Sequence, residues 1–141
     1  MAFHIIVIDD DLALQEFYRL LLEGEGYKVT LLSPFAASPG SITALHPNLI
    51  ILDLLLGGKQ SGWPILHALT TAPQTAALPI LLATALPVAA FVPEWKKFVQ
   101  THNIPVLFKP FDVDALLALI RSLLSDSLPL FSDSFYNETE S

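Results

Sequence analysis

Five short apolar runs alternate with amphipathic stretches along this chain of 141 residues. The runs HIIVI, YKVTLL, NLIILD, PILLATA and IPVLFK occupy residues 4–8, 27–32, 48–53, 79–85 and 104–109. Most of them are continuously hydrophobic, which is typical of parallel strands covered by helices on both faces. Strands that alternate with helices indicate βα units joined by right-handed crossovers. We therefore predict an α/β fold with a doubly wound, five-stranded parallel sheet.

Helical patterns fill the intervals between the apolar runs. Apolar residues recur at helical spacing from Leu12 until two glycines near position 24 can end the helix, and Asp11 is predicted to cap its start. Asp112 is a plausible N-cap for a final helix over 113–124. Two further helices are expected, one after Ser38 and one over about 63–71.

Prolines restrict the fourth helix. Pro87 and Pro93 leave only about 94–100 for a helix of normal geometry. We expect this helix to be short or irregular.

Length and composition favour one domain and exclude several classes of site. One domain over 1–124 and an acidic tail over 125–141 are predicted. The net charge of −7 argues against nucleic-acid binding, and the lack of cysteine excludes thiolate metal sites. Prolines divide the long uncharged stretch after Lys59, so no membrane span is predicted. Because no signal peptide is evident, a cytoplasmic location is the default expectation.

Polar residues follow the apolar runs at the predicted strand ends, where ligands bind in open α/β sheets. They are Asp9, Asp10 and Asp11 after the first run, Asp53 after the third, Thr84 in the fourth and Lys109 at the end of the fifth. Converging carboxylates repel one another unless a cation joins them, and oxygen ligands without His or Cys favour Mg²⁺. Metal, lysine and hydroxyl together suit a phosphoryl group, and a carboxylate can accept one covalently.

This set resembles the receiver domain of two-component response regulators. The resemblance is carried by IDDD at 8–11, LDLLLGGKQSG at 52–62, ATA at 83–85 and FKPF at 108–111, and it covers roughly residues 3–124. It implies a flavodoxin-like sheet of strand order 2-1-3-4-5 and a domain of the stand-alone type.

The resemblance also implies a role for each site residue. Asp53 would be the phosphoacceptor, with Thr84 and Lys109 contacting the phosphoryl group. Mg²⁺ would be held by Asp10 directly, by Asp9 partly through water, and by Asp53 and the backbone carbonyl of Leu55. A cis bond between Lys109 and Pro110 would aim the lysine into the site.

The implied partners are proteins. A sensor histidine kinase or a histidine phosphotransfer protein would supply the phosphoryl group, and an unidentified downstream protein would read the resulting change of conformation. The domain would be a monomer or a weak homodimer, with no turnover of a separate substrate.

Three features depart from the family pattern. Gly62 lies nine residues after Asp53 instead of eight, which affects the shape of the loop. Val106 stands where the family usually has an aromatic switch residue, so we expect signalling through a different surface. Leu55 and Leu86 are apolar where the family tends to modulate the attacking water, which predicts a long-lived phosphoryl group.

Two other functions remain open at this point. A phosphatase of the haloacid-dehalogenase kind also uses a nucleophilic aspartate with Mg²⁺, but Leu55 stands where that class has a second aspartate. A degenerate receiver that acts only by protein interaction is suggested by Val106, although the intact acidic set argues against it.

Overall fold

The computed structural model describes residues 2–125, and its five strands form one parallel sheet in the order β2-β1-β3-β4-β5. The strands are β1 (His4–Ile8), β2 (Lys28–Leu32), β3 (Leu49–Leu52), β4 (Ile80–Thr84) and β5 (Val106–Phe108). Every pair of neighbouring strands is parallel. The predicted doubly wound sheet and its strand order are confirmed.

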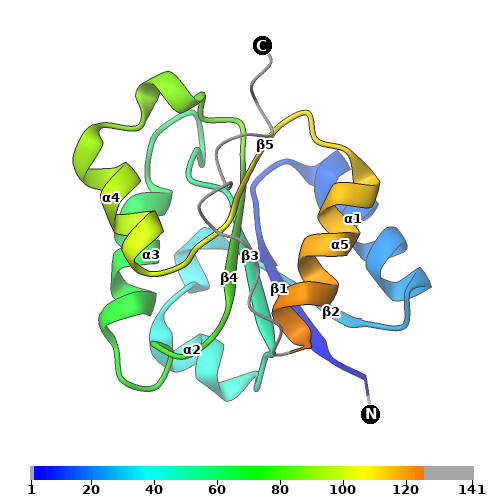
Figure 1. The fold of residues 1–141 in the computed structure, drawn as a ribbon. Coiled ribbons are helices and arrows are strands. Elements are labelled where there is room, and N and C mark those ends of the chain that lie inside the picture. Colours follow the sequence, from blue (N-terminus) through cyan, green and yellow to red (C-terminus); the bar gives the residue numbers. More distant parts are fainter. Residues whose placement is uncertain (1, 126–141) are drawn as a thin grey trace.

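Helices cover both faces of the sheet (Figure 1). One face is covered by α1 (Leu12–Gly24) and α5 (Val113–Leu124), and the other by α2 (Pro39–Ala44), α3 (Gly62–Thr71) and α4 (Pro93–Thr101). Within residues 2–125 no helix is both long enough and apolar enough to cross a membrane. Apart from Ser125, the predicted acidic tail lies outside the described residues.

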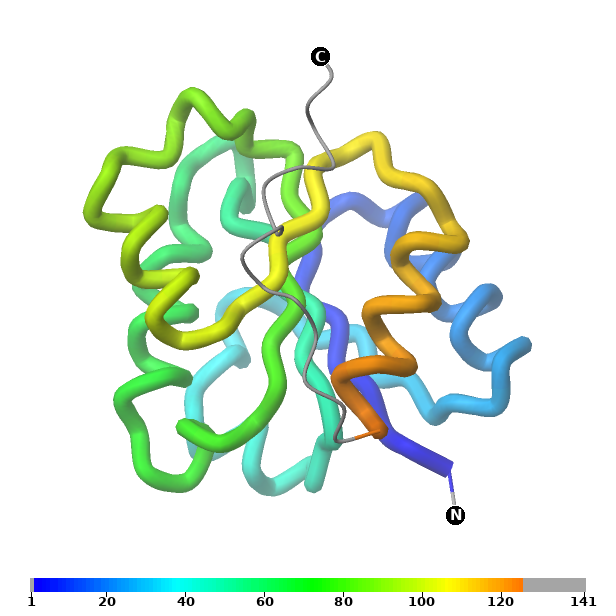
Figure 2. The backbone as a smooth tube through the Cα atoms, in the orientation of Figure 1, coloured from blue at the N-terminus to red at the C-terminus, as the bar shows by residue number. Residues whose placement is uncertain are grey.

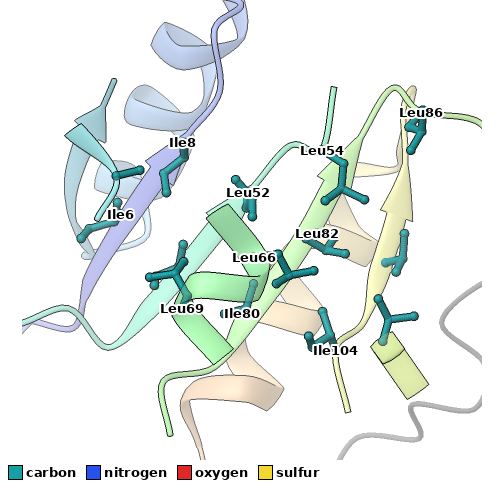
Figure 3. Packing of buried hydrophobic residues seen from close by; sticks show 14 of the residues in the cluster. Ile6, Ile8, Leu52, Leu54, Leu66, Leu69, Ile80, Leu82, Leu86 and Ile104 are labelled. Atoms are coloured by element: carbon teal, nitrogen blue, oxygen red, sulfur yellow. The ribbon is translucent and has the colours of Figure 1, made fainter. Parts of the chain in front are cut away.

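Side chains of each central strand alternate between the two layers of the core. In β1, Ile6 and Ile8 pack in the layer of α2, α3 and α4, whereas Ile5 and Val7 pack in the layer of α1 and α5. The same alternation runs through β3, β4 and β5. Figure 3 shows the first layer, in which Leu66 and Leu69 of α3 lie against side chains of the sheet. Burial on both faces explains why the strand sequences are continuously apolar.

Side-chain caps fix where α1, α2 and α5 begin, and the caps at Asp11 and Asp112 confirm the prediction from the sequence. Asp11 accepts a hydrogen bond from the Leu14 N–H and so caps α1, and Asp112 does the same for Ala115 in α5. Ser38 and Ser41 form a capping box at the start of α2. Each cap satisfies a backbone donor that the helix itself leaves unpaired.

The fourth connection is irregular only before the helix. A 3₁₀ turn, η2 (Val88–Ala90), lies between Pro87 and α4. The helix itself is regular and has nine residues, because Pro93 occupies the first turn, where a missing N–H is tolerated. The predicted helix is therefore short, as expected, but its irregularity is confined to the preceding turn.

The connections that follow β1, β3, β4 and β5 all lie at one end of the sheet, at the top of Figure 2. These strands are parallel, so their carboxyl ends meet there. The fold thereby brings together the polar residues that the sequence places after these strands.

Candidate functional site

The alternation of side chains continues past the strand ends and selects which polar residues meet. Asp9 follows Ile5 and Val7 in phase, and Asp53 and Lys109 likewise continue the residues that face α1 and α5. Asp10 has the opposite phase. This period of two places Asp9, Asp53 and Lys109 on one face of the sheet and Asp10 on the other.

Lys109 joins the two buried carboxylates. Its Nζ lies 2.7 Å from Asp9 Oδ2 and 2.8 Å from Asp53 Oδ2. Both aspartates are buried, with exposed fractions of 2% and 3%. Each carboxylate separately would be costly to bury, and the shared ammonium group offsets that cost.

The other oxygen of Asp53 is held by two donors. Thr84 Oγ1 donates to Asp53 Oδ1 at 2.5 Å, and the Leu55 N–H donates to the same oxygen at 2.9 Å. Thr84 is fully buried, and its hydroxyl also accepts the N–H of Leu86 at 3.0 Å. Asp53 is thus held by a cation, a hydroxyl and a backbone amide at the end of a central strand.

Asp10 points toward the loop after β3. Its carboxylate is exposed and accepts the Gly57 N–H at 2.6 Å. The Asp11 N–H donates to Asp9 Oδ1 at 2.9 Å, and Gln15 donates to the Asp9 carbonyl. Among residues 2–125, no three acidic, histidine or cysteine side chains are grouped as a ready-made metal site. Of the three acidic side chains predicted to bind the metal, Asp9 and Asp53 are joined by Lys109, whereas Asp10 accepts the Gly57 N–H. The fourth predicted ligand, Leu55, lies beside Asp53, because its N–H donates to Asp53 Oδ1.

Burial and charge act in opposite directions on the site's titratable groups. Burial raises the pKa of Asp9 above its ordinary value of 3.8, although hydrogen bonds from Lys109 and the Asp11 N–H oppose the shift. For Lys109, burial favours the neutral amine, but hydrogen bonds to Asp53 and Asp9 outweigh it and raise the pKa. The lysine is therefore cationic at neutral pH.

Two backbone features complete the site. The Lys109–Pro110 peptide bond is cis, as the resemblance implies. Gly62, the first residue of α3, donates its N–H to the Leu54 carbonyl at 3.0 Å. A Cβ at this glycine would lie 2.5 Å from the Asp53 carbonyl oxygen and from Leu54 Cα, so only glycine allows this close approach.

The donor set fits Mg²⁺ without a cage of carboxylates. This ion usually keeps several waters and takes one or two carboxylates as protein ligands. Here two buried carboxylates share Lys109, the next residue after Asp9 in the chain is Asp10 with an exposed carboxylate, and all candidate ligands are oxygen atoms. The residues at this edge could therefore hold the ion.

Sequence reasoning missed several contributors. Leu86 and Gly57 act through their backbone N–H groups, and no side-chain pattern reveals such a role. Tyr18 of α1 is completely buried, and its hydroxyl has no hydrogen-bond partner among the described residues. Burial, reinforced by the charges of Asp9 and Asp53, raises the pKa of this phenol.

An apolar groove lies next to the site, between α1 and the loop from β5 to α5. It has a volume of about 380 Å³, and its lining includes Leu14, Phe17, Pro110, Phe111 and Lys109. On the same helix Leu12 and Leu20 are 77% and 62% exposed. Exposed large apolar side chains beside a groove are typical of surfaces that contact another protein.

Comparisons with known proteins agree with this geometry. The family model described as "Response regulator receiver domain" matches residues 5–121. The DNA-binding dual master transcriptional regulator RpaA of Synechocystis sp. is 33% identical over 127 residues, which are 89% of this chain and 51% of that protein. The transcriptional regulatory protein FixJ of Bradyrhizobium diazoefficiens is 29% identical over 126 residues, 89% of this chain and 58% of FixJ. The chain thus spans about half the length of these relatives.

Solved structures show the same fold. A putative response regulator from Chloroflexus aurantiacus has a TM-score of 0.68 at 27% identity, covering 89% of this chain and 99% of its own. The chemotaxis response regulator CheY4 of Vibrio cholerae has a TM-score of 0.65 at 19% identity, covering 88% of this chain and 100% of its own. With the family model matching most of its length, the chain belongs to the receiver domain family of response regulators.

Proposed function

We propose that this receiver domain accepts a phosphoryl group on Asp53 from a phosphohistidine, with Mg²⁺, and signals to a protein partner by a change of conformation. The observation that carries the proposal is the environment of Asp53. Its buried carboxylate is held by Lys109, Thr84 and the Leu55 N–H where the central strands end. Lysine, hydroxyl and amide are the donors that a phosphoryl group bound there would need.

The chemistry assigns a task to each side chain. A carboxylate oxygen of Asp53 attacks phosphorus, an O–P bond forms, and the N–P bond of the phosphohistidine breaks, leaving its electron pair on the imidazole. Lys109 stays protonated and pairs with the added negative charge. Thr84, which now donates to Asp53, would donate to a phosphoryl oxygen instead.

Asp9, Asp10, Asp53 and the backbone carbonyl of Leu55 are the groups that would hold Mg²⁺. When bound, the ion supplies positive charge to the phosphoryl oxygens. Before it binds, Lys109 neutralises Asp9 and Asp53, and the Gly57 N–H holds Asp10. These contacts keep the acidic edge of the sheet folded in the metal-free protein.

The groove between α1 and the β5–α5 loop supports docking of the phosphodonor. It borders Lys109, and the helix that forms one of its sides, α1, also carries the exposed Leu12 and Leu20. A histidine kinase or histidine phosphotransfer protein bound there would hold its phosphohistidine close to Asp53. RpaA is named as a DNA-binding regulator, but this chain covers only 51% of that protein. The absence of nucleic-acid binding by this chain stays a prediction.

Mass spectrometry of the intact protein tests the proposal. Incubation with phosphoramidate and Mg²⁺ should add one phosphoryl group, and omission of Mg²⁺ should remove most of the product. Asp53→Asn should prevent the addition. Asp11→Asn is the matched control, because asparagine can still cap α1 and the product should form as in the wild type. An unmodified wild-type protein would refute the proposal.

No observation favours the two other functions. For a haloacid-dehalogenase phosphatase, the position two residues after Asp53 is Leu55, whose N–H, not a carboxylate, contacts Asp53. For a degenerate receiver, the contacts of Lys109 and Thr84 with Asp53 argue against loss of the acceptor site. Receiver domains are signalling domains, and we propose no turnover of a separate substrate.

A further inference from the structure

The hydroxyl of Thr84 connects Asp53 with the segment that leads to α4. It donates to Asp53 Oδ1 and accepts the N–H of Leu86, so a change of its partner alters both contacts. Thr84 has the phase of Ile80 and Leu82, whose side chains face α3 and α4. The acceptor site is therefore coupled to this side of the sheet through one buried hydroxyl.

The segment after Leu86 is built as a compact turn. The Ala90 N–H donates to the Pro87 carbonyl at 2.9 Å, and the Phe91 N–H donates to the Val88 carbonyl at 3.0 Å. Proline has a fixed φ, which leaves the chain little freedom at the start of the turn. A displacement of Leu86 is thus expected to move the turn together with the buried ring of Phe91, which follows it.

Phe91 lies between two other aromatic rings. Its ring packs edge-to-face on Trp63 of α3, with centroids 5.4 Å apart, and on Phe108 of β5, at 5.8 Å. Phe108 immediately precedes Lys109, whose ammonium group contacts Asp53. Both Thr84 and Lys109, the two side chains that would contact a phosphoryl group, are therefore linked to Phe91.

The chain of rings continues to the surface. Trp63 packs on Trp95 of α4, with a centroid distance of 4.2 Å. These two rings, with His67, Glu94 and Phe98, line a groove of about 240 Å³ between α3 and α4. The indole N–H of Trp63 is buried and has no hydrogen-bond partner within residues 2–125, so packing alone positions this ring.

We propose that this receiver reads the state of Asp53 through an aromatic relay, defined as Phe108, Phe91, Trp63 and Trp95, and that the groove between α3 and α4 changes in response. The inference rests on the proposed function, because it needs phosphorylation of Asp53. Val106, where the family usually has an aromatic residue, is buried two positions before Phe108 in β5, and both side chains pack in the layer of α3 and α4. The relay thus supplies the aromatic connection that Val106 does not.

Intrinsic fluorescence can test the relay, because Trp63 and Trp95 are the two tryptophans of the chain. The protein is titrated with beryllofluoride, an analogue of the phosphoryl group, in the presence of Mg²⁺. Fluorine NMR reports whether the adduct forms at Asp53, and tryptophan emission reports the relay. We expect emission to change in proportion to the adduct, and Asp53→Asn to abolish both signals.

A matched pair of variants separates the relay from general effects. Trp63→Phe keeps a ring between Phe91 and Trp95, so the remaining tryptophan should still respond to the adduct. Trp63→Leu removes the ring, and the response of Trp95 should fall at least fivefold while adduct formation is unchanged. Phe35→Leu, at a fully exposed ring outside the relay, should behave as the wild type.

The outcomes distinguish the two proposals. Failure of the adduct to form in the wild type would overturn the proposed function. An adduct that forms without a change of emission, or a Trp95 response that is equal in Trp63→Phe and Trp63→Leu, would overturn the relay alone.

Discussion

The carboxyl edge of the sheet and the flank formed by α3 and α4 are held in place by different interactions. At the edge, two buried carboxylates are held by one lysine, so charge pairing positions the groups. On the flank, Phe91, Trp63 and Trp95 are positioned by ring packing. The difference shows how one domain can place a reactive, charge-sensitive site next to a surface that responds through shape. Thr84 and Gly62 lie where these two regions meet.

Substitution of Lys109 should have the largest effect on the free energy of unfolding. This residue belongs to the carboxyl edge of the sheet and not to the flank formed by α3 and α4. Lys109→Met leaves Asp9 and Asp53 buried without a cation, and breaking such a pair costs about 3 kcal/mol. Urea unfolding without Mg²⁺ should show this loss. Lys96→Met, on the exposed surface of α4, should change the free energy of unfolding by less than about 0.5 kcal/mol. Equal effects of the two variants would break the contrast between edge and flank.

Gly62 connects the two regions, because this first residue of α3 packs against the backbone of Asp53 and Leu54. Gly62→Ala places a Cβ 2.5 Å from the backbone of Asp53 and Leu54, so we expect a loss of about 2 kcal/mol and weaker Mg²⁺ binding. Gly40→Ala, in α2, has open space around its Cβ and should be neutral or stabilising by about 0.5 kcal/mol. Calorimetry of both variants makes the comparison. A Gly62→Ala protein as stable as the wild type would show that the backbone of Asp53 and Leu54 can move to make room for the Cβ.

The lifetime of the phosphoryl group should depend on the edge and not on the flank. Leu55 and Leu86 offer no polar side chain to orient an attacking water, so we expect a half-life much longer than seconds. Leu55→Asn should shorten it roughly tenfold by positioning water near Asp53. Trp95→Phe, on the flank, should leave it unchanged. A wild-type half-life of seconds, measured by loss of the phosphorylated mass, would contradict this interpretation.

Substitution of Asp9 should have the smallest effect, and it should change how the free energy of unfolding depends on pH. Because burial raises its pKa, the folded protein binds this proton more tightly than the unfolded chain does. The associated stability is fully present below the ordinary pKa of 3.8 and is lost as pH rises through the raised value. Asp9→Asn should therefore unfold at higher urea than the wild type at pH 7 without Mg²⁺. Lower stability of this variant at pH 7 would show that its ion pair with Lys109 outweighs the burial.

Much of the edge could be predicted from the sequence, because its residues follow a simple rule. Apolar runs locate the strands, and the carboxyl ends of neighbouring parallel strands must meet, which places Asp9, Asp53, Thr84 and Lys109 together. Successive side chains of a strand point to opposite faces, so Asp10 lies on the other face from Asp9, although the two side chains are of the same type.

The flank could not be predicted in the same way. Phe91 and Trp63 are far apart in sequence, and neither belongs to a strand, so no periodicity brings them together. Aromatic residues near helices are usually core or interface, and this general expectation gives no pairing of rings. Similarly, the regular geometry of α4 depends on Pro93 occupying its first turn, a position that a count of prolines alone does not identify.

Location of the phosphorylated residue tests the central claim most directly. The protein is phosphorylated with phosphoramidate and Mg²⁺, reduced with borohydride, which converts an aspartyl phosphate to homoserine, and mapped by peptide mass spectrometry. We predict homoserine at position 53 and unmodified aspartate at positions 9 and 10. Homoserine at either of those two positions, or at none of the three, would contradict the account.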